Sequence, residues 1–280
     1  MYEVNPFTKT TLSVWESKPP KSSRRTNVQA IAIRPVDRYP QPKPDLAGID
    51  ALLGSLPQPK KIKLIEIDYD SKMTALPSLD RFANLEYAHI GAGKIKSYEA
   101  LGLLKKLRSL FIVNYGEPDL GAFKHLKLDS LRLIRGRFSS VTTTAKLAFF
   151  QSCSKLHEFS GGRIEHLLLD GCHNVDLDSL HSVKGLTRLE VLGRKSFPHF
   201  KFLTRCKGLR ELVVTASPLG KSDLKALEHA TSLRRVFLSI SDKLVARIGK
   251  ANKRLLVTNA DLTYYKGAPS DDHWEDHWNS

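Results

Sequence analysis

The C-terminal stretch His273–Trp278, HWEDHW, carries residue types that often hold a metal ion. Two histidines four residues apart could both face a cation from one side of a helix, with the carboxylates between them close by. The spacing differs from the zinc-hydrolase motif HExxH, because the glutamate stands two positions after the first histidine rather than one. The stretch also lies near a chain end, where precise geometry is hard to maintain. We expect a solvated acidic and aromatic tail or cap and no metal site, with partner docking or incidental metal binding as the alternatives.

Two further features could carry catalytic chemistry. Gly91–Ser97, GAGKIKS, has the glycines of a phosphate-binding loop but lacks the spacing GxxxxGK[ST], and it falls where a turn would follow a strand. No GxSxG motif is present, and Cys153, Cys172 and Cys206 match no zinc or nucleophile signature. The sequence therefore predicts no catalytic residue and no cofactor, and we expect a protein that is not an enzyme.

The composition is that of a folded and strongly basic chain. Its 280 residues are 41% hydrophobic, and 44 Lys and Arg against 29 Asp and Glu give a formal net charge of +15. Such a charge attracts nucleic acids, anionic membranes and acidic proteins without defining a fold. The odd number of cysteines argues against a disulfide framework. The sequence shows neither a secretory leader nor an apolar run of about 18 residues. These features favour a cytoplasmic protein that does not span a membrane.

A short apolar pattern recurs along most of the chain. GLTRLEVLG at Gly185–Gly193 is echoed 23 residues later by GLRELVVTA at Gly208–Ala216. The pattern has apolar residues at its first, fourth and sixth positions, as expected for a short strand with one buried face. Such a strand cannot bury its apolar face alone, so a fixed period predicts stacked units whose strands form a parallel sheet. The pattern begins at Val28, Ile62, Leu85, Leu107, Leu128, Ile164, Leu186, Leu209 and Leu233, and six of the eight steps are 21 to 24 residues long.

The repeated unit resembles that of leucine-rich repeat proteins, LxxLxLxxN/CxL, with about 20 to 29 residues per turn. Ile164, Leu167, Leu169 and Cys172 match it best. Most other copies lack Asn or Cys at the ninth position, so the chain resembles irregular, bacterial-type members, and the internal ladder of side-chain bonds is predicted to be largely missing. The resemblance implies an α/β fold: a right-handed leucine-rich repeat solenoid, with a parallel sheet on the concave side and helices and irregular arcs on the convex side.

This pattern divides the chain into three predicted parts. Residues 1–27 form a polar N-terminal segment, residues 28–258 a solenoid of about eight or nine turns, and residues 259–280 an acidic and aromatic tail or cap.

Two of the steps are too long for one turn. After Leu128 we interpret Val141–Ser152 as a helix and the residues that follow, up to Ile164, as a distorted turn. The proline-rich residues 34–61 are predicted to contain a short helix over 50–56. The connecting segments have helical spacing, as in KSDLKALEHATSL, where Ser222 is the expected N-cap.

The third, fifth, seventh and eighth positions of each unit are predicted to face the concave side. These positions, which include Asn114, mix aromatic residues with charges of both signs, so the excess positive charge must lie on arcs, edges and termini. Aromatic and arginine side chains are typical anchors of protein interfaces. We therefore predict a non-catalytic protein-binding scaffold whose partner carries acidic patches. The predicted contact residues are Tyr69, Tyr87, His89, Phe111, Arg132, Arg135, His166, Arg188, Glu190, Arg235 and Phe237.

Two other functions stay open at this point. A nucleic-acid-associated protein could use basic edges such as KPPKSSRR and LLKKLRS, and its binding would weaken steeply with salt. The resemblance to bacterial repeat proteins also implies an immunity or inhibitor protein that binds a toxin.

Overall fold

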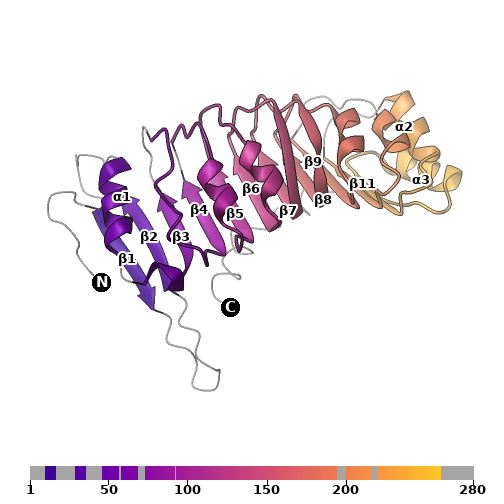
Figure 1. The fold of residues 1–280 in the computed structure, drawn as a ribbon. Coiled ribbons are helices and arrows are strands. Elements are labelled where there is room, and N and C mark those ends of the chain that lie inside the picture. The colour runs from indigo at the N-terminus through magenta and orange to yellow at the C-terminus, as the bar shows by residue number, and fades with distance from the viewer. Residues whose placement is uncertain are drawn as a thin grey trace, which may run out of the picture.

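The computed structural model describes residues 10–16, 29–35, 46–56, 58–68, 73–91, 93–193, 200–215 and 220–259. In this part of the chain, twelve strands form a single sheet whose spatial order is their order in the sequence. β1 and β2 are antiparallel, and each later pair of neighbours is parallel. Figure 1 shows the strands following one another from indigo to yellow. The strands are β1 Thr10–Glu16, β2 Gln29–Pro35, β3 Ile62–Asp68, β4 Tyr87–Gly91, β5 Ser109–Val113, β6 Leu128–Ile134, β7 Ser140–Gln151, β8 Glu158–Asp170, β9 Arg188–Leu192, β10 Glu211–Val214, β11 Arg235–Leu238 and β12 Leu256–Asn259.

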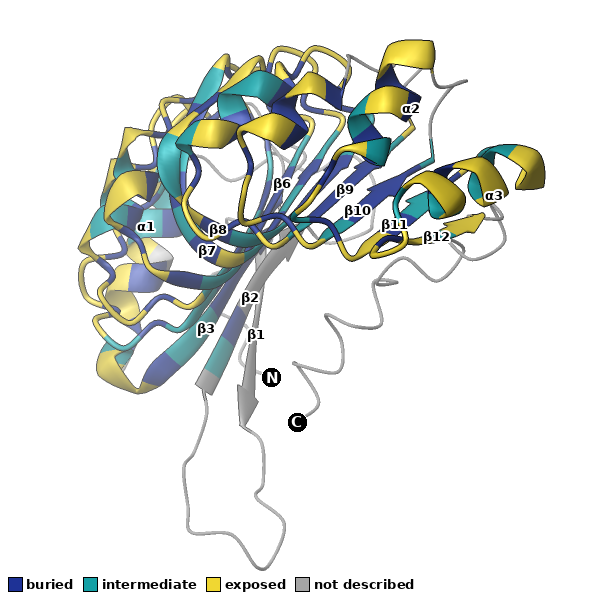
Figure 2. Ribbon diagram, turned by 90° about the vertical axis from the view of Figure 1, so that its right-hand side faces the viewer, coloured by how far each residue is buried: buried dark blue, intermediate teal, exposed yellow. Residues whose placement is uncertain are grey.

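Many of the described connections between strands contain short helices, which lie on one side of the sheet (Figure 2). The short helix predicted over 50–56 is confirmed, although it begins four residues earlier than expected. The predicted N-cap Ser222 is wrong: the cap is Gly220, whose N–H donates to Oδ2 of Asp223 at 2.9 Å. The helices in the described residues are α1 Leu46–Ser55, α2 Lys221–Glu228 and α3 Asp242–Ala251, with 3-10 helices η1 Pro59–Lys61, η2 Glu99–Leu103, η3 Gly121–His125, η4 Leu177–Ser182 and η5 Phe200–Thr204.

The core lies between the sheet and these connections. The fourth and sixth positions of each unit point inward, so Leu110, Leu131 and Leu189 are fully buried. Connecting residues such as Leu101 and Phe123 close the core from the other side and are equally buried. Each such side chain contributes about 1.5–3 kcal/mol through removal of its apolar surface from water. The repeated apolar positions thus explain why the chain winds into a stack, because each turn covers the edge of the next.

The predicted helix over Val141–Ser152 is wrong, because these residues form β7, which pairs in parallel with β6 and β8. Its β-branched stretch VTTT favours a strand, and its inward face carries Val141, Thr143 and Ala145. The predicted distorted turn is also wrong, since Glu158–Asp170 is one long strand, β8.

β7 is a further repeat unit with small residues at its apolar positions. Ala145, Ala148, Phe150 and Cys153 stand at its first, fourth, sixth and ninth positions, and all four are buried. The long step from Leu128 to Ile164 therefore contains two short turns.

Side-chain bonds inside the turns are more frequent than predicted. Sγ of Cys172 contacts the Phe150 carbonyl oxygen at 3.3 Å, and Sγ of Cys153 contacts the carbonyl oxygen of Leu133 at 3.6 Å. Asn114 stands at the eighth position of its unit, one before the position that Cys153 and Cys172 occupy in theirs, yet its side chain also points inward. The predicted concave position of Asn114 is therefore wrong.

The bonds of Asn114 connect it to the preceding turn. Its Nδ2 donates to the carbonyl oxygen of Ile95 at 2.9 Å and to Oη of Tyr98 at 2.8 Å. Its Oδ1 accepts from the N–H of Gly116 at 2.6 Å. Asn114 thus forms the hydrogen bonds inside the turn that are expected of an asparagine at the ninth position.

Among the described residues, no helix has the length and apolar character needed to cross a membrane.

Candidate protein-binding face

All helices of the described residues lie on one side of the sheet, and we call the opposite face the open face (Figure 2). It presents two rows of side chains, one from the third and one from the fifth position of each unit. The third-position row runs from β3 to β11 through Leu64, Tyr87, Ser109, Ser130, Leu147, His166, Arg188, Glu211 and Arg235. The fifth-position row runs through Glu66, His89, Phe111, Arg132, Phe149, Leu168, Glu190, Val213 and Phe237.

Five consecutive residues of the fifth-position row form a continuous stack, which we call the Arg132 stack. Nδ1 of His89 lies 3.6 Å from Oε1 of Glu66, and the His89 ring stacks on Phe111 with centroids 4.3 Å apart and planes at 13°. The guanidinium carbon of Arg132 lies 4.9 Å from the ring centroid of Phe111 and 4.9 Å from that of Phe149. The stack comes from β3 to β7, so it joins five turns of the solenoid.

The geometry of the Arg132 stack holds a cation against two aromatic faces. Arg132 is only 9% exposed. A planar, weakly hydrated guanidinium tolerates this burial better than an ammonium group would, and its attraction to each ring contributes about 0.5–2 kcal/mol. Because both rings hold it in place, little side-chain entropy remains to be lost when a partner binds.

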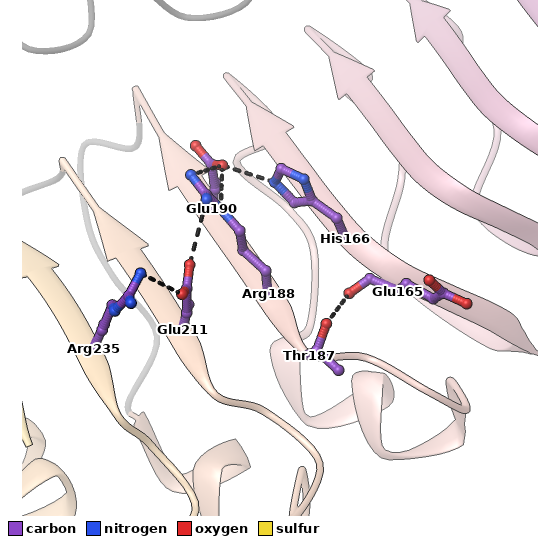
Figure 3. Close-up of polar contacts among 7 residues, drawn as sticks. All are labelled: Glu165, His166, Thr187, Arg188, Glu190, Glu211 and Arg235. Carbon is purple, nitrogen blue, oxygen red and sulfur yellow. Dashed lines mark hydrogen bonds and ion pairs between the residues drawn. The ribbon is translucent and has the colours of Figure 1, made fainter. Parts of the chain in front are cut away.

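The C-terminal half of the open face carries a chain of charges, which we call the ion-pair ladder (Figure 3). Oε1 of Glu190 lies 2.7 Å from Nε2 of His166 and accepts from Nε of Arg188 at 2.8 Å. Nη1 of Arg188 donates to Oε2 of Glu211 at 3.3 Å, and Oε1 of Glu211 accepts from Nη1 of Arg235 at 3.1 Å. The ladder thus crosses four strands, from β8 to β11.

The ion-pair ladder hides its carboxylates and exposes its guanidinium groups. The side chains of Glu190 and Glu211 are 5% and 24% exposed, whereas those of Arg188 and Arg235 are 41% and 59% exposed. Burial opposes ionisation of Glu190, but the hydrogen bond with His166 and the charge of Arg188 outweigh it and lower the pKa of that carboxyl. The outer surface of this half therefore offers cationic donors, although the charges of the ladder are almost balanced.

The structure brings most of the predicted contact residues onto the open face. His89, Phe111 and Arg132 belong to the Arg132 stack; His166, Arg188, Glu190 and Arg235 belong to the ion-pair ladder. Tyr87 and Phe237 lie in the two rows and are half-buried. Tyr69 lies outside the described residues, as does the stretch His273–Trp278.

Arg135 does not join the other predicted residues. It follows the end of β6 with a φ of 61°, in the left-handed region. Its Nη1 donates to Oη of Tyr115 at 3.0 Å, and its guanidinium carbon lies 5.5 Å from the Tyr115 ring centroid. Arg135 and Tyr115 form a separate exposed pair.

Sequence reasoning missed three residues of these clusters. Glu66, at the start of the Arg132 stack, was left out of the contact set. Phe149 completes the Arg132 stack, and it was missed because β7 was interpreted as a helix. Glu211 joins Arg188 to Arg235. It was predicted to lie on the concave side but was left out of the contact set. In a sheet, the partners of a residue lie across neighbouring strands, so the register of the turns is the signal that would have found all three.

Neither a scan of protein-family models nor a search of curated proteins found a match to this chain. Among solved structures, the internalin InlF of Listeria monocytogenes is similar, with 20% identity, 78% of this chain and 63% of that chain covered, and a TM-score of 0.39. The internalin C2 of the same species has 15% identity, coverage of 77% and 92%, and a TM-score of 0.36. A leucine-rich repeat protein of Leptospira interrogans has 15% identity, coverage of 75% and 85%, and a TM-score of 0.24. This chain thus spans less than two thirds of the length of InlF.

These sequence identities and TM-scores are too low to support an argument about function. The class of fold follows from the chain itself: apolar repeats, parallel strands in sequential order and inward-pointing asparagine and cysteine residues define an irregular leucine-rich repeat solenoid.

Proposed function

We propose that this chain is a non-catalytic scaffold that binds another protein through the open face of its sheet. The observation that carries the proposal is the Arg132 stack, in which a guanidinium is held between Phe111 and Phe149. Arginine and aromatic side chains that are already desolvated and ordered are typical of the residues that dominate protein interfaces. The half-buried Tyr87 and Phe237 extend the aromatic character of the same face to either side.

The ion-pair ladder supports a partner with an acidic patch. Arg188 and Arg235 point exposed donors outward, while the carboxylates that neutralise them are more deeply buried. A carboxylate of the partner would gain charge-assisted hydrogen bonds from these guanidinium groups. Such complementarity mainly sets specificity and the rate of association, and the aromatic anchors supply affinity.

The charges of the open face favour a protein partner over a nucleic acid. The two rows from β3 to β11 contain three arginines and three glutamates, so phosphate groups would meet carboxylates as often as cations. The toxin-inhibitor role that the resemblance implies stays a prediction, and it would be recognised through the identity of the captured partner.

The test is capture of partners from a native lysate on the immobilised chain, with and without nuclease, at about 0.1 and about 1 M salt. Between these concentrations the screening length falls from about 10 to about 3 Å. We expect the wild type to retain one protein in stoichiometric amount at both salt concentrations and after nuclease treatment. The double variant Arg132→Ala, Phe149→Ala should lose that protein, whereas Lys106→Glu, on an exposed connection, should keep it.

Two results would overturn the proposal. One is recovery of nucleic acid alone, released by salt. The other is equal retention of the protein by the wild type and the double variant, which would place binding elsewhere.

A further inference from the structure

A second candidate site lies on the helical side of the solenoid, away from the open face. η5 and α2 pack against each other, and together with the turn before β11 they line a pocket of about 790 Å³. This volume falls within the range of about 300–1,000 Å³ that small-molecule sites occupy. The apolar lining residues are Phe200, Leu203, Ala226 and Ala230, of which Phe200 is fully buried.

The polar residues that line this pocket, within the described ranges, are basic or neutral. Lys201, Lys207, Arg210 and Lys225 line it together with His229, and none of the lining residues that the structure describes is Asp or Glu. All four Lys and Arg residues are exposed, and none of them forms one of the ion pairs found within the described part of the chain. The open face differs, because there Arg188 and Arg235 are neutralised by glutamates.

This arrangement has an electrostatic cost that an anion would relieve. Like charges gathered in a hollow with an apolar floor repel one another, and the low-dielectric wall focuses their potential into the pocket. Arg210 is also held in place, because its Nη1 donates to the carbonyl oxygen of Ser232 at 3.0 Å. Ser222, Thr231 and Ser232 add hydroxyl groups, which can donate hydrogen bonds to anionic oxygens.

The density of charge indicates the chemical class of the ligand. Four cations line a pocket of small-molecule volume, whereas a carboxylate brings one negative charge and a phosphate about 1.5 to 2. Two or three linked phosphates would therefore match the four cations in the available space, and a peptide would need four carboxylates in the same space. Phosphate oxygens also suit the donors of Arg and Lys.

We propose that this pocket binds a polyphosphate group carried by a nucleotide-like small molecule. The proposal is independent of protein binding at the open face, because the two sites use opposite sides of the sheet and share no residue.

The test is calorimetric titration of the full chain with inorganic tripolyphosphate, with ATP and with a short oligothymidylate. The pocket variant carries Lys201→Glu, Lys207→Glu and Lys225→Glu, all at exposed positions. The matched control carries Lys106→Glu, Lys127→Glu and Lys184→Glu, which are also exposed and lie outside the pocket. Both variants change the net charge by the same amount, and thermal unfolding checks that both remain folded.

We expect the wild type and the control variant to bind tripolyphosphate with similar Kd, and the pocket variant to bind it about tenfold or more weakly. We also expect ATP to bind more tightly than the oligonucleotide, and the reverse order would contradict the proposal, because a strand carries only singly charged phosphodiesters. Equal weakening in both triple variants would overturn the proposal, because binding would then follow total charge. No binding of any of the three probes would overturn it as well. The variant Arg132→Ala should bind tripolyphosphate normally, so failure at this pocket and failure at the open face can be told apart.

Discussion

The guanidinium carbon of Arg132 lies 4.9 Å from the ring centroid of Phe149, on the neighbouring strand of the sheet. Phe149 belongs to β7, the unit in which alanines replace the usual leucines. The contact therefore joins an ordinary unit to an atypical one, and it completes the enclosure of Arg132 that Phe111 begins. The strand assignment of β7 and the proposed binding face depend on the same residue, so both can be tested together.

Phe149 and Phe150 are adjacent but should respond differently to substitution, because alternate residues of a strand point to opposite faces. Phe150 is fully buried and contacts Phe138 and Phe159 edge-on, so Phe150→Ala should lower the free energy of unfolding by about 3–5 kcal/mol. Phe149→Ala removes a half-buried ring and one cation–π contact, and should lower it by about 1 kcal/mol. Urea unfolding of both variants measures the difference. Similar losses would contradict the alternation of β7.

Asn114 should be a major source of stability in its turn. Asn114→Ala removes two buried hydrogen bonds and a partly buried one, and leaves the Tyr98 hydroxyl and the Gly116 N–H without these bonds. We therefore expect a loss of about 2–4 kcal/mol in the free energy of unfolding. Asn174 is an exposed control whose Nδ2 donates once, to the carbonyl oxygen of Ser154 at 2.6 Å. Asn174→Ala should cost about 1 kcal/mol or less. A loss at Asn114 no larger than at Asn174 would show that the turn does not depend on this side chain.

Two adjacent glycines of β8, Gly161 and Gly162, lie where this strand pairs with β7, and only Gly162 is required for reasons of space. A Cβ added to Gly162, whose φ is +94°, would lie 2.0 Å from the Thr143 carbonyl oxygen, whereas at Gly161, with a φ of +111°, it would meet nothing within 4 Å. Gly161→Ala should cost about 1–3 kcal/mol through backbone strain alone. Gly162→Ala should cost clearly more or prevent folding. Expression yield and thermal unfolding of the two variants make the comparison, and equal values would rule out the close contact.

Units whose apolar positions hold mainly large aliphatic residues could be recognised as strands from the sequence. The unit of β7, with alanines at two of these positions, could not. All nine predicted strand positions carry strands, because leucine, isoleucine and valine at a 21- to 24-residue period leave little choice of buried face. β7 was missed because Ala145 and Ala148, three residues apart, fit a helix as well as a repeat.

The candidate site could also be predicted only in part from the sequence. Alternation along the strands was enough to place His89, Phe111 and Arg132 on one face. Their stacking could not be predicted, because it depends on the side chains of neighbouring strands and on register. Arg135 pairs with Tyr115 and not with either row. Its own left-handed backbone turns the chain after β6, and the apolar pattern does not record such a change.

The ion-pair ladder predicts a pH dependence of stability through Glu190. Its pKa is lower in the folded chain than its ordinary value of 4.5, so the unfolded chain binds the proton first as the pH falls. Ionised Glu190 therefore stabilises the fold above pH 4.5, and this contribution is lost as the pH falls through the folded-state pKa. The difference in unfolding free energy between the wild type and Glu190→Gln should be larger at neutral pH than at about pH 3. A difference that does not change with pH would exclude this role.

The most direct measurement of the central claim is the Kd of the captured protein partner for the wild type, Arg132→Ala and Arg135→Ala. Both variants lose one arginine charge, but only Arg132 lies between two aromatic rings of the open face. We predict that Arg132→Ala raises Kd about tenfold or more, and that Arg135→Ala changes it by less than about twofold. An unchanged Kd for Arg132→Ala, or an equal rise for both variants, would contradict binding through the Arg132 stack.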